Sequence, residues 1–558
     1  MVSLDHALAA LASIAAIRGR QAEATDLARL AARMAQGQPL EGGGPDSASV
    51  RDALEHLRAG RPEQAVADAL QDLPQDLRRL VRTSGLDVSE VAALHRETGA
   101  TSIGELEACL ADAQGWPGVP GLDARLRQAI PLVRSQRRHT PLGRAWALVE
   151  PVVTAVRETC PEVEHVSPTG SMRRFAATVG DIELLAASPD PAGTTARLLA
   201  LPFVTTVLHA SPGRVVLRLE RTELTIRVVP PGAFPATLVL LTGSRAHVAR
   251  LRVRAASLGL RLDRRGLWRD GGALDLVAEN DVYAALELPA IAPELRESGE
   301  EVDAAERGAL PDLVRVEDIR GDLHMHSTWS DGRDSIAAMV SAAEALGYEY
   351  VAITDHSKAS AVARGLDEAR LRQQAAEVAD LRERHPGITI LHGAEVDILE
   401  DGSLDFPDAV LEGLDVVLAS LHDPAGHDGA RLTDRYIAAM RHPLVQIVTH
   451  PTNRMLPGRD GYDLDEERLF AAAVETGTIL EIDGAPGHLD MDGAMARRAV
   501  AAGVTVSIDG DCHRAEWLGR QMQLGVATAR RGWVEARHVV NALPLDSLRA
   551  RLGRKRRA

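Results

Sequence analysis

The chain has 558 residues, of which 45% are hydrophobic and 25% charged, a composition typical of folded globular protein. Its formal net charge of −16 excludes an evenly basic surface for DNA, so any nucleic-acid contact must depend on local patches. The three cysteines, Cys109, Cys160 and Cys512, are odd in number and far apart, which excludes a disulfide framework.

The first residues have the pattern of a packed helix. Leu4, Leu8, Leu11 and Ile14 recur at helical spacing, and no basic segment precedes them as it would in a signal peptide. No run of about 20 apolar residues follows anywhere in the chain, so we expect no membrane span and a cytoplasmic protein.

Helices are also expected through the rest of the N-terminal quarter. Residues 1–70 are rich in Ala, Leu and Arg, and residues 71–135 contain two short helix-turn-helix units. The two turns are similar, Ser84-Gly-Leu-Asp87 and Pro120-Gly-Leu-Asp123. At the other end of the chain, the basic tail Arg551–Ala558 is interpreted as a solvated end, with a local DNA contact as the alternative.

The middle of the chain has mixed structure. Residues 136–235 contain a helical pattern followed by β-rich runs, among them Gly180–Leu185 and Val215–Leu219. A helical and mixed segment follows at 236–295. Residues 296–318 are charged and lack sustained periodicity, which predicts a linker.

From residue 319 to 558, short apolar runs alternate with helical patterns. We expect strands at Tyr350–Thr354, Ile388–Leu391, Val416–Ala419, Ile447–Thr449, Thr478–Ile482 and Val504–Ile508. Such repeated strand–helix alternation predicts a parallel α/β barrel, in which the strand ends converge even when they are far apart in sequence.

Histidines and carboxylates follow these strands. They are His324, His326, Asp331, His356, Glu395, His422, His450, Asp511 and His513. His324 and His326 should share one strand face, as should Asp511 and His513, because side chains repeat every two residues in a strand. Cys512 should then point to the opposite face as a small buried hydrophobic residue.

This set of ligand types predicts a metal site. Imidazole nitrogen and carboxylate oxygen together suit zinc, manganese or iron, whereas Mg²⁺ alone would be bound mainly by oxygen. Nine candidate ligands are too many for one ion and indicate a cluster of two or three. Ions about 4 Å apart can clamp a phosphate ester, so the sequence predicts a phosphoesterase.

The segment 319–558 resembles the PHP domain (polymerase and histidinol phosphatase), whose fold is a distorted (β/α)7 barrel. The resemblance implies a first ion held by His324, His326, Glu395 and Asp511, a second by Glu395, His422 and His450, and a third by Asp331, His356 and His513. His324, Glu395 and Asp511 would be the central catalytic positions. Lys358 is a candidate phosphate contact, with a solvated lysine as the alternative.

The upstream run Thr169–Leu185 resembles the nucleotidyltransferase signature of family X DNA polymerases. Gly170, Ser171 and Arg174 could hold a nucleotide triphosphate through backbone amides, a hydroxyl and a guanidinium. Asp181 and Glu183, two residues apart on a strand, could bind Mg²⁺. The run Leu241–His247 and several later ones continue the likeness.

Taken together, residues 71–545 resemble a bacterial family X polymerase fused to a PHP exonuclease. The implied fold is multidomain α/β: a helical N-terminal domain (1–70), a helix-hairpin-helix region (71–135), a nucleotidyltransferase-like α+β palm (136–235) and a thumb-like domain (236–295). A linker (296–318) and the PHP barrel (319–558) complete it. The implied role is base-excision repair, with gapped DNA or 3′ ends, and possible dNTP, as partners of a monomer.

Several positions depart from the family pattern. The second carboxylate is Glu183 in place of Asp, and the third falls on the neutral Thr225. Leu240-Leu241 stands where the family has Tyr-Phe, and Phe175 replaces a glycine. Asp87 and Asp123 occupy hairpin turns where the family has glycine, and no lysine precedes Lys358 to form a Schiff base with an abasic sugar.

The favoured interpretation is a Mn²⁺- or Zn²⁺-dependent 3′–5′ exonuclease that acts on DNA ends, with polymerase activity weak or lost. Loss of one metal-binding carboxylate lowers the rate of nucleotidyl transfer by about a thousandfold. The alternatives are a working gap-filling polymerase, a small-molecule phosphatase and a non-catalytic DNA-end binding module. His488, where the fused family usually has arginine, leaves room for the phosphatase.

Overall fold

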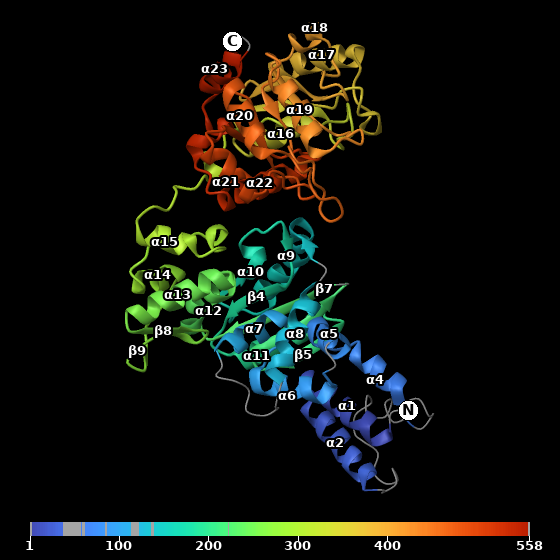
Figure 1. Ribbon diagram of the computed structural model, residues 1–558, viewed down its shortest axis with the longest axis vertical. Helices are drawn as coiled ribbons and strands as arrows, with labels where there is room; N and C mark the ends of the chain where they lie inside the picture. The colour runs from blue at the N-terminus through green and yellow to red at the C-terminus, as the bar shows by residue number, and fades with distance from the viewer. Residues whose placement is uncertain are drawn as a thin grey trace.

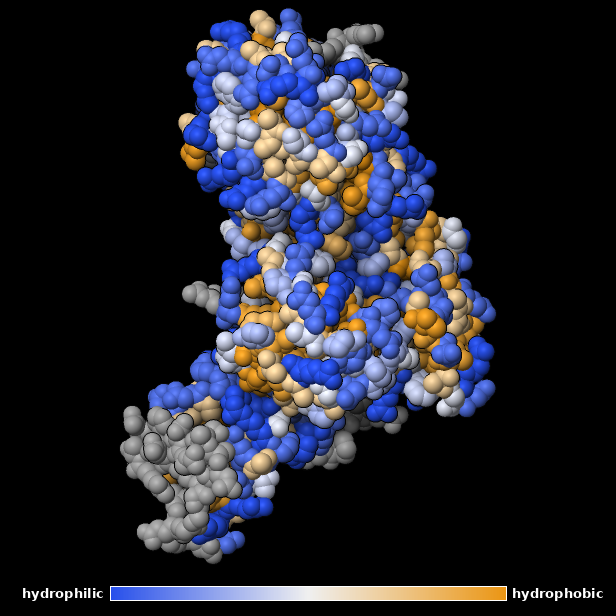
Figure 2. All heavy atoms as spheres, turned by 180° about the vertical axis from the view of Figure 1, so that it is seen from behind, coloured by the Kyte–Doolittle hydropathy of each residue, from blue (hydrophilic) through white to orange (hydrophobic). Residues whose placement is uncertain are grey.

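The computed structural model describes residues 3–36, 57, 62–83, 86–112, 122–135, 139–220 and 222–555. The chain runs from N-terminal helices at one end, through a mixed central region, to a C-terminal barrel at the other end (Figure 1). Seen from behind, a narrowing separates the barrel lobe from the central region (Figure 2). No helix in the described part of the chain is both long and apolar enough to cross a membrane.

The N-terminal region is helical, as expected. Its helices are α1 (Leu4–Ile17), α2 (Gln21–Ala35), α4 (Pro62–Leu70), α5 (Gln75–Thr83), α6 (Val88–Thr98), α7 (Ile103–Asp112) and α8 (Leu122–Ser135). Asp87 is the N-cap of α6: it accepts the Glu90 backbone N–H at 2.9 Å, and Glu90 accepts the Asp87 N–H in return at 3.0 Å. A helix cap therefore explains this aspartate. Residues 84–85 and 120–121 of the two turns lie outside the described residues.

The palm-like region centres on a five-stranded sheet of order β2-β4-β7-β6-β5. Its strands are β2 (His165–Pro168), β4 (Ile182–Ala187), β5 (Thr206–Ser211), β6 (Arg214–Leu219) and β7 (Thr222–Val229), with β1 (Thr140–Pro141) and β3 (Thr178–Val179) pairing beside it. Helices α9 (Leu142–Thr159), α10 (Gly170–Arg173) and α11 (Pro191–Leu199) accompany the sheet. Strands β4 and β7 run parallel, and their register places Glu183 directly opposite Thr225.

A small antiparallel sheet and helices follow. They are α12 (Phe234–Thr242), α13 (Arg245–Ser257), β8 (Leu260–Asp263), β9 (Gly266–Arg269), β10 (Gly272–Ala273), α14 (Glu279–Ala285) and α15 (Glu300–Glu306). Helix α15 lies inside the segment expected to be a linker. Its Val302 and Ala305 are buried in the same core cluster as α12 and α13. The charged residues of 296–318 hid this apolar face, so that segment is in part a packed extension of the thumb-like region.

The C-terminal region contains a parallel sheet of seven strands within the described stretch 222–555, in the order β11 to β17. They are β11 (Gly321–Asp322), β12 (Tyr350–Ile353), β13 (Thr389–Asp397), β14 (Val416–Ser420), β15 (Ile447–Val448), β16 (Ile479–Asp483) and β17 (Val506–Asp509). A parallel bridge between Met325 and Cys512 joins the extension of the first strand to that of the last. The predicted multidomain α/β fold with a nearly closed parallel barrel is therefore confirmed.

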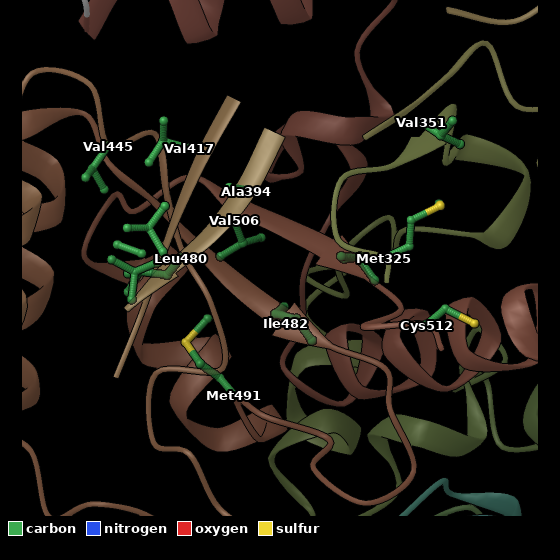
Figure 3. Close-up of a cluster of buried hydrophobic side chains, with 14 of the residues drawn as sticks. Met325, Val351, Ala394, Val417, Val445, Leu480, Ile482, Met491, Val506 and Cys512 are labelled. Atoms are coloured by element: carbon green, nitrogen blue, oxygen red, sulfur yellow. The ribbon is translucent and has the colours of Figure 1, made fainter. Parts of the chain in front are cut away.

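Helices surround the barrel strands. They are α16 (Ile336–Ala345), α17 (Glu368–Arg384), α18 (Asp408–Leu411), α19 (Gly429–Met440), α20 (Glu466–Thr476), α21 (Gly493–Ala501), α22 (Leu518–Arg531) and α23 (Leu545–Lys555). Strand and helix side chains form one large buried cluster (Figure 3). Cys512 is fully buried in it, as predicted.

Helix α23 contradicts the interpretation of the C-terminal tail as a solvated end. Leu548 and Leu552 are buried against Tyr350 and neighbouring strand residues at the amino end of the barrel. Lys555 is also buried and donates to Thr478 Oγ1 at 2.5 Å. Leu548 and Leu552, four residues apart on α23, carry the packing, which the charge of the segment concealed. Residues 556–558 lie outside the described part.

Two loops at the carboxyl end of the barrel reach the palm-like region. Leu456, after β15, and Leu489, after β16, pack with the core of the palm-like sheet. Arg531 of α22 donates to the carbonyl oxygen of Arg174 at 2.8 Å and pairs with Glu297 at 2.6 Å. The end of the barrel that should carry the metal site is thus held against the central region.

Candidate metal centre

The predicted ligands of the first ion converge at the carboxyl end of the barrel. His326 Nε2 lies 3.1 Å from His324 Nε2 and 3.0 Å from Asp511 Oδ1. His324 Nε2 lies 3.6 Å from Asp511 Oδ1 and 3.6 Å from Glu395 Oε1. His324, His326 and Glu395 have fully buried side chains, and that of Asp511 is 10% exposed.

Glu395 is the centre of a second group. Its Oε1 lies 2.9 Å from His450 Nε2 and 3.4 Å from His422 Nε2. Its Oε2 lies 2.7 Å from His356 Nδ1. The carboxylate therefore faces candidate ligands of more than one ion, which is the position that a bridging ligand requires.

The third group is more exposed. Asp331 Oδ1 lies 3.2 Å from His513 Nε2, 3.6 Å from His356 Nε2 and 4.0 Å from His326 Nδ1. The side chains of Asp331 and His513 are 35% and 29% exposed, so this edge of the site opens to solvent. His356 contacts both this group and Glu395, and it could serve either ion.

These distances fit divalent ions. A metal bound at about 2.0–2.2 Å by two nitrogen or oxygen atoms places those atoms about 3.0–3.5 Å apart. Most of these separations are close to this range. Ligand atoms lie within 4.8 Å of one another in three sets: His326, Asp331, His356 and His513; His324, His326 and Asp511; and His356, Glu395 and His422. His326 Nδ1 and His450 Nδ1 are buried without a hydrogen-bond partner among the described residues. The mixture of imidazole nitrogen and carboxylate oxygen donors is suited to divalent metal ions.

The electrostatics of the site follow from this crowding. Burial alone would raise the pKa of Glu395, but His356, His422 and His324 outweigh burial and lower it well below its usual range. Burial would lower the pKa of His422, but Glu395 and Asp397 raise it to about 10. Burial and the neighbouring His356 and His513 lower the pKa of His326 to about 4. Glu395 is thus held ionised and His326 neutral, the states that bind metal, whereas His422 must release its proton when a metal ion binds.

Two carboxylates that the sequence interpretation missed orient the histidines. Glu481 Oε1 lies 2.7 Å from His324 Nδ1, and Glu481 Oε2 accepts the His450 backbone N–H at 2.7 Å. Asp397 Oδ1 lies 2.8 Å from His422 Nδ1. The sequence contained a feature that could have identified Glu481, because this charged residue lies inside the apolar run Thr478–Ile482. Such partners fix the tautomer and ring direction of a metal-binding histidine.

The backbone differs from expectation at the last strand. Strand β17 ends at Asp509, and Asp511 has a φ of 46°, in the left-handed region. Strand alternation therefore does not explain why Asp511 and His513 share a site; a turn brings them together. His450 also has a positive φ, 23°. Non-glycine residues rarely adopt such conformations, and they cluster where function requires them.

Lys358 follows the ligand candidate His356 by two residues, and His488 packs against another ligand candidate. The Lys358 ammonium lies 3.7 Å from Glu368 and 5.7 Å from the centre of the Phe406 ring, with its side chain 44% exposed. His488 stacks on the ligand candidate His450, with ring centres 5.6 Å apart. Lys358 remains a candidate phosphate contact, and His488 lies next to the metal centre.

The palm-like carboxylates are engaged within the chain. Glu183 Oε1 accepts from Arg227 Nε at 3.1 Å, and Glu183 Oε2 lies 3.5 Å from Thr169 Oγ1. Asp181 and Glu183 line a cavity of about 370 Å³ together with Thr225. Because Thr225 is directly opposite Glu183, the third acidic position of this face is occupied by a neutral hydroxyl.

The residues that could bind a triphosphate belong to α10 or directly follow it. Gly170 begins the helix with a φ of 59°, and Ser171 follows it. Arg174 donates to Glu297 at 2.9 Å and to the Thr242 carbonyl oxygen at 2.7 Å, so its guanidinium is held within the chain. Phe175 has a φ of 54°, which explains the preference for glycine there. Leu240 and Leu241 belong to α12, where Leu240 is buried.

Comparison with known proteins gives matches along most of the chain. A family model described as DNA polymerase beta thumb matches residues 237–297, and one described as PHP domain matches residues 322–451. The DNA polymerase/3′-5′ exonuclease PolX of Bacillus subtilis is 35% identical over 90% of this chain and 88% of its own. A probable phosphatase of Thermoanaerobacter sp. is 32% identical over 36% of this chain and 81% of its own.

A solved structure of Leishmania infantum polymerase beta covers 40% of this chain and 99% of its own at 18% identity, with a TM-score of 0.28. The PolX match spans the helical, palm-like, thumb-like and barrel regions together, whereas the phosphatase match spans little more than a third of the chain. The thumb and PHP models fall in the regions where the thumb-like fold and the metal centre were found. The chain therefore belongs to the family of the bacterial DNA polymerase/3′-5′ exonuclease PolX, in which a family X DNA polymerase is joined to a PHP domain.

Proposed function

We propose that this protein acts mainly as a metal-dependent 3′–5′ exonuclease that trims DNA ends during repair, and that its polymerase activity is weak or lost. One observation carries the proposal. All nine predicted donors converge at the barrel, whereas the palm-like face has Thr225 in place of an acidic ligand and holds Glu183 in an ion pair with Arg227. DNA as substrate is supported by the PolX relative.

The residues of the barrel have distinct tasks in this proposal. His324, His326, Glu395 and Asp511 would hold a first ion, Glu395, His422 and His450 a second, and Asp331, His356 and His513 a third. Mn²⁺ or Zn²⁺ bound there would supply Lewis-acid charge opposite the scissile phosphate. Glu481 and Asp397 hold His324 and His422 in orientation. The exposed edge at Asp331 and His513 would admit the DNA end.

The palm-like region would contribute binding more than synthesis. Asp181 and Glu183 could hold Mg²⁺, and Gly170, Ser171 and Arg174 could hold a dNTP. Arg174 would first have to leave Glu297, and Glu183 would have to leave Arg227. Each rearrangement costs part of the binding free energy, in addition to the loss of a third carboxylate. We propose a monomer in which this region holds gapped or 3′-ended DNA.

A single gel assay tests the proposal. Gapped and 3′-recessed labelled duplexes are incubated with purified protein and Mn²⁺, with and without dNTPs. We expect shortening from the 3′ end without dNTPs, no such shortening with His324→Ala, and little or no extension with dNTPs. Intact substrate with the wild-type protein would contradict the exonuclease. Efficient extension that disappears in Asp181→Ala would instead support a gap-filling polymerase.

A small-molecule phosphatase is the second candidate, because a probable phosphatase of Thermoanaerobacter sp. is 32% identical over 36% of this chain and 81% of its own. The rate of hydrolysis of a nucleotide phosphomonoester is compared with that of an oligonucleotide in the presence of the same metal ion. Faster turnover of the monoester would favour the phosphatase over the exonuclease.

A further inference from the structure

The helical module formed by α5, α6 and α7 is docked on the carboxylate face of the palm-like sheet. Gln75, at the start of α5, donates its backbone N–H to both carboxylate oxygens of Glu223 on β7, at 2.8 and 2.9 Å. Arg214 on β6 donates to the Gly99 carbonyl oxygen, between α6 and α7, at 2.6 Å. The cavity beside Asp181 and Glu183 is consequently lined both by the helical module and by the palm-like sheet.

Glu105 of α7 lies at the centre of this contact, among three arginines of the central region. Its Oε2 lies 2.6 Å from Arg214 Nη2, and its Oε1 lies 2.5 Å from Arg227 Nη2 and 4.0 Å from Arg264 Nη1. The side chain of Glu105 is 11% exposed, those of Arg214 and Arg227 9% and 16%, and that of Arg264 39%. The three guanidinium groups therefore surround one carboxylate.

The arrangement has the chemistry of a phosphate site. Arginine guanidinium groups bind carboxylate and phosphate with the same forked geometry, and phosphate contacts supply much of the affinity of proteins for DNA. The adjoining cavity of about 370 Å³ is lined by Arg79, Arg144 and Arg214 together with carboxylates. These carboxylates are Asp76, Glu105, Asp181, Glu183 and Glu223. Burial would raise the pKa of Glu105, but Arg214 and Arg227 lower it below its usual range, so the occupant is an anion.

We propose that Arg214, Arg227 and Arg264 form a binding site for a phosphate group of a DNA strand, and that Glu105 occupies this site as an internal competitor until DNA displaces it. Arg227 also pairs with Glu183, so displacement of Glu105 rearranges the palm-like carboxylates at the same time. DNA as the ligand rests on the proposed function, whereas the three-arginine site does not.

A binding experiment with Glu105→Gln tests the site. The full-length protein is titrated into a fluorescent gapped duplex whose 3′ ends carry phosphorothioate linkages that resist hydrolysis, and anisotropy gives Kd at several salt concentrations. We expect Glu105→Gln to bind about tenfold more tightly than wild type. Its slope of log affinity against log salt should be steeper by about one, because one more phosphate contact forms.

The chain supplies a matched control. Glu107 lies on the same helix and pairs with Arg134 and Arg245, away from the three arginines. Glu107→Gln removes the same charge and should change Kd less than twofold. In the Glu105→Gln background, Arg264→Ala should return the affinity to the wild-type value. An equal gain in Glu107→Gln, or none in a folded Glu105→Gln, would overturn the site.

A second measurement needs no substitution at Glu105. Amide hydrogen exchange of residues 99–112 is followed in the wild-type protein with and without the protected duplex. If phosphate displaces Glu105, α7 loses its contacts with Arg214 and Arg227, and its amides exchange faster in the complex. Unchanged or slower exchange in the presence of bound duplex would contradict displacement. Neither measurement depends on hydrolysis, so failure of the exonuclease proposal would be seen separately in the gel assay.

Discussion

Glu481 and His324 form a buried pair at the base of the metal centre, with Glu481 Oε1 2.7 Å from His324 Nδ1. The pairing directs His324 Nε2 toward His326, Asp511 and Glu395. The second oxygen of Glu481 accepts the His450 backbone N–H, so one carboxylate positions ligand candidates from two different loops. The metal centre therefore depends on a residue that is not itself among its predicted ligands.

We expect Glu481→Gln to lower metal affinity and exonuclease rate about 10- to 100-fold, because the amide is a poorer acceptor for the imidazole N–H. Metal content after dialysis against limiting Mn²⁺ and the rate at saturating Mn²⁺ separate the two effects. Glu466→Gln is the control, since Glu466 pairs with Arg498 on the outside of the barrel. Equal metal content and rate in Glu481→Gln and wild type would refute the orienting role.

Removal of divalent ions should destabilise the barrel. Ions that bind the folded state alone stabilise it by mass action, by about 2.7 kcal/mol at a concentration of 100 Kd. We expect dialysis against a chelator to lower the melting temperature and abolish 3′ shortening, and readdition of Mn²⁺ to restore both. The same treatment of His324→Ala should change its melting temperature less. If chelation left the melting temperature of the wild-type protein unchanged, this result would contradict a metal cluster.

Restoring an acidic residue at position 225 should strengthen polymerase activity. Thr225 lies opposite Glu183 on adjacent parallel strands, so Thr225→Asp would place a third carboxylate on the same face as Asp181 and Glu183. We expect dNTP incorporation on a gapped duplex with Mg²⁺ to rise at least about tenfold. Thr222→Asp, on the same strand and cavity, is the control. A gain no larger than that of Thr222→Asp would show that Thr225 is not the limiting position.

The sequence was sufficient for much of the barrel because two local patterns agree there. Apolar runs predicted the strands, and polar residues at their carboxyl ends predicted the candidate ligands. Closure of the barrel brings these ligands together. His324, His326 and Glu395 needed no knowledge of long-range contacts. Cys512 was placed in the core by the same reasoning, although the turn at Asp511 shows that alternation was not the full cause.

The rest depends on pairs that no local pattern contains. Glu105 and Arg214 are 109 positions apart, and Arg174 and Glu297 are 123 apart. In the sequence, Glu105, Arg214 and Glu297 resemble ordinary surface charges, and Arg174 resembles a phosphate contact. The docking of one region on another decides that these charges are paired, and therefore that the Arg174 guanidinium is engaged by Glu297.

The pH dependence of stability should reveal the buried Lys555. Burial lowers the pKa of Lys555 from 10.5 to about 7. Between pH 7 and 10.5 the unfolded chain therefore binds a proton that the folded chain does not, so stability rises with pH in this window and falls as pH drops toward 7. The slope from this group is at most about 1.4 kcal/mol for each pH unit.

We expect Lys555→Met to be more stable than wild type near pH 7, and to lack the part of the pH dependence between pH 7 and 9.5 that Lys555 supplies. Thermal melting of both proteins at several pH values in this range measures the difference. Lys358→Met is a matched control, because the other lysine of the sequence is 44% exposed and loses the same charge. Parallel curves for wild type and Lys555→Met would mean that Lys555 keeps its proton in the folded protein.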